Sequence, residues 1–133
     1  MLPALRAALV CERLLTEVDG VMSAIRIFNQ LALPPGTTFE ATLLIMLASV
    51  EPAAEEHHEI VMRMMSDAGE VLGAQRFAVR APLAAGESFS LVLPFRLQAP
   101  AAETTFWLAL AYDTEDQELT RLPIRFRQPA TRA

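Results

Sequence analysis

The side chains most able to do chemistry cluster at residues 55–59 (EEHHE), and Met62, Met64 and Met65 follow them. Imidazoles with carboxylates could bind zinc, and imidazoles with thioethers could bind Cu(I). On a strand, however, adjacent side chains point to opposite faces, so the two imidazoles would not easily reach one ion. We therefore interpret the cluster as a solvated loop that leads into a strand whose Met side chains fill gaps in the core. No metal and no cofactor is expected.

The single cysteine, Cys11, has the apolar neighbours Leu9 and Val10, which favour a buried, unreactive thiol. The chain contains no G-x-S-x-G motif for a serine nucleophile and neither of the glycine-rich phosphate-binding motifs. Its paired carboxylates, at 55–56 and 113–118, fall in expected loops, where solvent keeps both ionised and unsuited to general acid catalysis. The sequence therefore predicts a protein that is not an enzyme.

Arginine is the residue type whose distribution indicates binding chemistry. The chain has 11 basic residues, all of them Arg, against 16 acidic ones, which gives a formal net charge of −5. A field of this sign repels nucleic acids and anionic membranes, so neither is expected as a partner. Six arginines nevertheless fall at polar-facing positions of expected strands: Arg76, Arg80, Arg96, Arg121, Arg125 and Arg127.

Two interpretations of these arginines stay open. If neighbouring strands align them, they form a basic stripe that grips carboxylate or phosphate groups through paired hydrogen bonds. Alternatively, their stems cover apolar surface and their guanidinium groups pair with carboxylates such as Glu70, Glu87 or Asp113.

Turn signals recur at short and even spacing along the chain, as in all-β sandwiches and barrels. They lie at 19–20, 34–36, 51–52, 67–69, 82–86, 99–100 and 115–116, and they imply about eight strands. Apolar and polar residues alternate at 89–97 and 121–127, which is typical of half-buried strands. Because Pro94 and Pro123 lack the N–H that a ladder needs, each should lie at an edge, a strand start or a bulge. We predict one all-β domain over residues 1–133, an antiparallel two-sheet β-sandwich of immunoglobulin-like or C2-like type.

The first two strands should form a hairpin, and electrostatics selects its register. A two-residue loop would set Arg13 opposite Arg26, and these adjacent like charges would destabilise the pairing. A three-residue loop with Gly20 in the left-handed conformation instead sets Glu12 opposite Arg26. We therefore predict the second register, with Glu12 and Arg26 as a structural pair, and a turn of the same kind at 67–69.

Two segments, 43–48 (LLIMLA) and 106–111 (FWLALA), are apolar on both faces. A two-sheet sandwich leaves the outer face of each sheet in water, so a loop, the first hairpin or another subunit must cover these faces. We expect a homo-oligomer, most simply a homodimer.

The beginning of the chain indicates its compartment. Residues 1–10 are apolar, but Arg6 interrupts the run, so we interpret them as the first strand rather than a signal peptide. The single cysteine fits a reducing compartment, and a cytoplasmic protein is expected.

Both ends of the chain resemble a family of small bacterial proteins of unknown function. The resemblance rests on 8–12 (ALVCE), the Asp-Gly turn at 19–20, 21–27 (VMSAIRI), 106–108 (FWL) and 121–126 (RLPIRF). It covers the first hairpin and the last two strands and leaves out the middle of the chain. It implies an all-β sandwich and supplies no activity or catalytic residue.

The leading functional hypothesis is a non-enzymatic intracellular protein-interaction or scaffold module of unspecified partner. Two-faced apolar strands and Arg-rich faces carry residue types that are enriched at interfaces. The alternative is a module that binds a small anionic ligand or nucleic acid on the Arg-rich sheet face.

Overall fold

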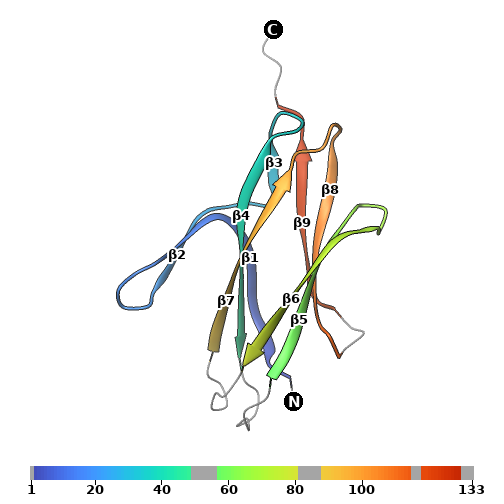
Figure 1. The fold of residues 1–133 in the computed structure, drawn as a ribbon. Coiled ribbons are helices and arrows are strands. Elements are labelled where there is room, and N and C mark those ends of the chain that lie inside the picture. Colours follow the sequence, from blue (N-terminus) through green and yellow to red (C-terminus); the bar gives the residue numbers. More distant parts are fainter. Residues whose placement is uncertain (1, 49–56, 81–87, 115–117, 130–133) are drawn as a thin grey trace.

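The computed structural model describes residues 2–48, 57–80, 88–114 and 118–129, and these form an all-β sandwich (Figure 1). The prediction of fold class is confirmed, with nine strands in place of about eight. The strands are β1 (Ala4–Thr16), β2 (Met22–Ile27), β3 (Gln30–Ala32), β4 (Thr38–Ala48), β5 (His57–Met65), β6 (Val71–Arg80), β7 (Ser88–Gln98), β8 (Thr104–Tyr112) and β9 (Glu118–Arg127). The described ranges contain no helix that is long and apolar enough to cross a membrane.

The strands form a four-stranded sheet in the order β2-β1-β4-β7 and a five-stranded sheet in the order β3-β9-β8-β5-β6. Neighbours are antiparallel, except that β3 runs parallel to β9. β4 and β7 pair in one sheet, while β5, β8 and β9 lie in consecutive order in the other. Immunoglobulin-like sandwiches have the same arrangement, with strands B and E paired in one sheet and strands C, F and G in consecutive order in the other.

The inner faces of the two sheets meet in one apolar core. Its fully buried side chains include Leu43, Ile45 and Leu47 of β4, and Leu108 and Leu110 of β8. The strands with predicted alternation contribute as expected: Leu93, Phe95, Leu97, Ile124 and Phe126 are all buried in this core. Burying an aliphatic or aromatic side chain of this size stabilises a fold by about 1.5–3 kcal/mol, so this core is the main stabilising feature.

The first hairpin adopts the register that the three-residue loop predicts. Thr16 lies opposite Met22, and the amide of Glu17 donates to the carbonyl of Val21 at 2.8 Å. Gly20 has a φ of +85°, the left-handed conformation that the loop requires. The hairpin extends away from the body of the sandwich (Figure 1).

Within that hairpin, the Arg26 guanidinium and the Glu12 carboxylate form an ion pair at 2.8 Å. The turn at 67–69 has the same geometry, with Gly69 at a φ of +89° and a hydrogen bond from the Ser66 amide to the Glu70 carbonyl at 2.8 Å. Turn geometry therefore selects both registers, and in the first hairpin the cross-strand ion pair supports it.

The return strand of the hairpin is shorter than its sequence suggests. Residues 21–33 appear continuous in sequence, but β2 ends at Ile27 and the chain crosses to the other sheet before β3 begins. Two hydrogen bonds fix this crossing, from the Phe28 amide to the Val10 carbonyl at 3.0 Å and from the Arg125 amide to the Asn29 carbonyl at 2.8 Å. The Phe28 ring packs edge-to-face on Phe39 with centroids 5.4 Å apart, so tertiary packing divides the strand.

Both strand prolines lie at sheet edges, as predicted. Pro94 is on β7, the last strand of its sheet. Pro123 is on the part of β9 that β3 leaves uncovered, because β3 pairs only with 125–127. The nitrogen of Pro123 faces the open edge, as the Arg125 amide two residues on does, so Pro123 removes no ladder hydrogen bond.

Tyr112 joins the end of β8 to the beginning of the chain. Its hydroxyl donates to the Pro3 carbonyl at 2.7 Å, and the side chain is buried. Burial raises the pKa of Tyr112 from its ordinary value of 10 to about 12.

This shift predicts a loss of stability in alkali. Between pH 10 and 12 the unfolded chain releases the Tyr112 proton while the folded chain keeps it, so the free energy of unfolding falls by about 2–3 kcal/mol as pH rises through this window. Urea unfolding across this range measures the effect.

The Tyr112→Phe variant is the control. It should lose about 1 kcal/mol or more at neutral pH, because the Pro3 carbonyl is left without its donor, but it should lack this part of the alkaline decline. Tyr112 is the single tyrosine of the chain, so absorbance titration of the native protein reads its pKa directly. A native tyrosine that ionises near pH 10 would contradict the prediction.

Candidate functional site

Among the described residues, six buried apolar ones lie outside the core, on the outer faces of the sheets. Cys11, Leu44 and Ala48 belong to the four-stranded sheet, and Val61, Ala109 and Ala111 to the five-stranded one. The predicted two-faced character of 43–48 and 106–111 is therefore present in the structure. The outer faces differ in what surrounds these residues.

On the four-stranded sheet, the surroundings are apolar. Three consecutive cross-strand rows contain no Asp, Glu, Arg or His. They are Ala7, Met46 and Ser90; Leu9, Leu44 and Val92; and Ile27, Cys11, Thr42 and Pro94. We call these rows the apolar outer face. Val92 is 45% exposed and Ile27 is 61% exposed, so the face is open to solvent.

Charges border this face at one end. Arg13, Glu40 and Arg96 each lie two residues beyond the last row on their own strands and therefore point to the same side. Glu40 and Arg96 are cross-strand partners joined by a 2.8 Å ion pair. An apolar centre with a charged rim is the composition of a protein interface.

Cys11 is completely buried within the apolar outer face. Burial raises the pKa of its thiol, which outweighs the lowering effect of a backbone hydrogen bond with Arg13. A thiol of this kind is a poor nucleophile, as its sequence neighbours predict.

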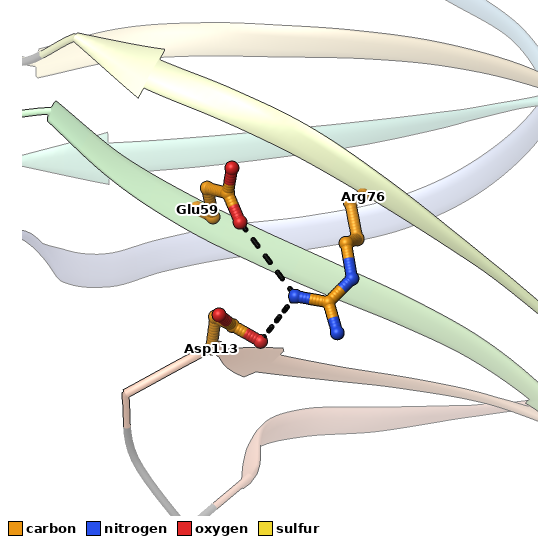
Figure 2. Close-up of polar contacts among 3 residues, drawn as sticks. All are labelled: Glu59, Arg76 and Asp113. Carbon is orange, nitrogen blue, oxygen red and sulfur yellow. Dashed lines mark hydrogen bonds and ion pairs between the residues drawn. The ribbon is translucent and has the colours of Figure 1, made fainter.

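On the five-stranded sheet, the outer face carries both basic and acidic side chains. Arg76 of β6 pairs with Asp113 at 2.5 Å and with Glu59 at 3.6 Å (Figure 2). The Arg121 guanidinium donates two hydrogen bonds to the Glu118 carboxylate, and these lower the pKa of that carboxyl. These carboxylates neutralise the guanidinium groups that they contact.

The structure does not bring all six predicted arginines together. Arg76, Arg121, Arg125 and Arg127 lie on the five-stranded sheet, whereas Arg96 lies on the other one. Arg125 and Arg127 are exposed and have no ion-pair partner among the described residues. The side chain of Arg80 is outside the described residues.

Part of the His and Met cluster lies on a strand where a loop was expected, because β5 already begins at His57. Residues 55–56 and the His57 side chain are outside the described residues, and the His58 ring packs edge-to-face on Tyr112 with centroids 5.9 Å apart. Met62 is buried in the core, in keeping with the gap-filling role predicted for it. Among the described residues, no group of three or more His, Cys, Asp or Glu could hold a metal ion.

Sequence reasoning missed Arg63 and Trp107, which also lie on the outer face of the five-stranded sheet. The Trp107 indole N–H donates to Asp67 at 3.1 Å, and Trp107 is the cross-strand neighbour of Pro123 and Met65. Arg63 and Arg121 flank Ala109 in the next row. Alternate residues of 104–112 point to the same face, so Trp107 could have been grouped with Ala109 and Ala111. Because every residue of this segment is apolar or Thr, however, the sequence does not indicate which face is the outer one.

No family model matches the chain, and no curated protein matches it significantly. The resemblance of the first hairpin and the last two strands to a family of small bacterial proteins stays a prediction.

The burial of Cys11 predicts a slow thiol. In the native protein, a disulfide reagent such as DTNB should react with Cys11 about 100-fold more slowly than in denaturant, because the sheet must open first. The matched control carries Cys11→Ala with Val71→Cys, which moves the only thiol to a position that is 55% exposed in the native chain. Equal rates for Cys11 and the control thiol would show that Cys11 is accessible.

Proposed function

We propose that the protein is a non-enzymatic protein-interaction module, and that its apolar outer face packs against the same face of a second copy. The observation that carries this proposal is the set of three uncharged rows around Leu44 and Cys11. Within these rows, Val92 and Ile27 are exposed to solvent. Removing such a patch from water is favourable, at about 25 cal/mol per Å² of apolar surface.

The dimensions of the sheet suit a dimer. Three strands spaced about 4.8 Å apart over the length of an 11-residue β4 that rises about 3.3 Å per residue, with the six-residue β2 beside them, give a face of roughly 600 Å². A standard protein interface buries about 800 Å² on each partner. Two such faces can pack as the sheets of a sandwich do, with the charged end of each at the rim.

This proposal has more support than an anion-binding role for the predicted arginines. Arg76, Arg96 and Arg121 each already hold a carboxylate, which removes most of their attraction for a further anion. A buried thiol in the apolar outer face supports a reducing compartment, and we propose a cytoplasmic location.

The mass of the protein in solution tests self-association. Light scattering at micromolar concentration should give twice the 14.6 kDa of the chain. Val92→Glu places a charge in the proposed interface at a half-exposed position that the fold tolerates, and should weaken the dimer at least tenfold, to a monomer.

The matched control is Val71→Glu, the same change at a 55% exposed valine of the five-stranded sheet. It should stay dimeric. A monomeric wild-type protein, or a Val92→Glu variant that dimerises as tightly as the Val71→Glu variant, would refute the proposed interface.

A further inference from the structure

Two strand edges without a strand partner meet at one side of the sandwich. β2 pairs with β1 only from Cys11 onwards, so in the described part of the chain 4–10 have no strand on that side. β3 pairs with β9 only at 125–127, so 118–124 have none either. Residues 28–29 cross between the sheets just above, where they bond to Val10 and Arg125. Below this crossing, β1 and β9 lie side by side without pairing.

The edge of β9 offers backbone groups to a further strand. The Arg125 amide points away from β8, because it donates to Asn29. In an antiparallel ladder alternate residues point the same way, so the Arg121 amide and the carbonyls of Arg121 and Pro123 also face outward. Pro123 has no N–H to leave unpaired there, which agrees with its position.

A groove lies on each side of this edge, and the two share Asn29 and Pro123. The groove toward the other sheet has a volume of about 310 Å³ and is lined mostly by apolar side chains, among them Leu9, Phe28 and Leu122. The groove on the outer face has a volume of about 290 Å³. Its lining includes Gln30, Thr105, Trp107 and Arg125 and contains no acidic residue.

The two grooves differ in the side chains they would accept. Successive side chains of a strand point to opposite faces, so a strand added to this edge would project alternately into the apolar groove and onto the outer face. Arg125 has no ion-pair partner among the described residues, and the Thr105 hydroxyl and Gln30 amide lie beside it. This groove therefore complements a carboxylate.

We propose that the β9 edge binds an extended segment of a partner protein in which apolar and acidic side chains alternate, as an added strand of the five-stranded sheet. Such strand addition is a common mode of peptide recognition, in which backbone hydrogen bonds give affinity and side-chain grooves give specificity. The inference rests on the proposed protein-interaction role but centres on the β9 edge, and its apolar groove shares only Leu9 and Ile27 with the apolar outer face.

A peptide is favoured over a nucleic acid by the charges around the site. Nucleic acids gain affinity by neutralising several successive phosphates. Here the Arg121 guanidinium is already hydrogen-bonded to Glu118, and the chain as a whole has a formal net charge of −5. One carboxylate beside the Arg125 guanidinium on the outer face fits this arrangement, whereas a run of phosphates does not.

The probe is a fluorescein-labelled peptide of about eight residues in which Val and Glu alternate. Its anisotropy at low salt should rise to saturation with the wild-type protein. Arg125→Glu should weaken binding at least tenfold and should reverse the preference toward a Val–Lys peptide. Arg96→Glu, the same charge change on the other sheet, should leave the affinity unchanged.

Hydrogen exchange tests the pairing itself. The Arg121 amide should become protected when the peptide binds, and a peptide with alternate N-methylated residues should lose affinity because its donors are removed. Absent protection of Arg121, equal binding of the Val–Lys peptide, or an oligothymidylate that competes with the same dependence on Arg125 would each overturn the inference.

The Val92→Glu variant separates this inference from the proposed dimer. Val92 lies on β7, the strand of its sheet farthest from the β1 edge, so its substitution should leave peptide affinity unchanged. Failure of peptide binding in a protein that dimerises through Val92 would refute strand addition alone. Peptide binding by a wild-type monomer would refute the dimer alone.

Discussion

The structure depends on the packing of two apolar inner faces into one core, and the chain carries more apolar residues than that core can use. β4 and β8 show this directly, since each supplies fully buried side chains to the core and further buried ones, such as Leu44 and Ala109, to an outer face. The outer faces then need a cover. On the five-stranded sheet, arginine side chains on β5 and β9 flank Ala109. On the four-stranded sheet, the neighbours of Leu44 are apolar too, which is why that face is the candidate interface.

Local chemistry made much of this fold predictable. The period of two identified 89–97 and 121–127 as half-buried strands, and the left-handed Gly20 with the Glu12–Arg26 pairing determined the register of the first hairpin. Long-range choices were not predictable in this way. Nothing in residues 21–33 marks the point at which the chain leaves one sheet for the other, because that point is determined by contacts of Phe28 and Asn29 with residues far along the sequence.

The charge pairs on the five-stranded sheet show the same limit. Asp113 was among the carboxylates expected to pair with an arginine, and it pairs with Arg76 from a strand that is not adjacent in sequence. Glu118 and Arg121 are three residues apart, and in a regular strand they would point to opposite faces. They meet because the ladder between β8 and β9 shifts register at Leu110 and Ala111, beside Glu118. An irregularity of this kind depends on the partner strand and leaves no signal in either sequence segment.

The edges of the sheets decide how specific strand addition can be. An open edge with a full set of donors and acceptors pairs with almost any extended chain, and proteins limit this hazard with proline and short cover strands. Here β3 covers 125–127 and Pro123 removes one donor, so a strand that docks on β9 must itself donate at the Pro123 carbonyl. A slip of one residue would also move every apolar side chain from the inner groove to the charged face. Pro123 removes one donor from this edge, and the edge has an apolar groove on one side and Arg125, unpaired among the described residues, on the other. Together these features select both the pattern of the partner and its register.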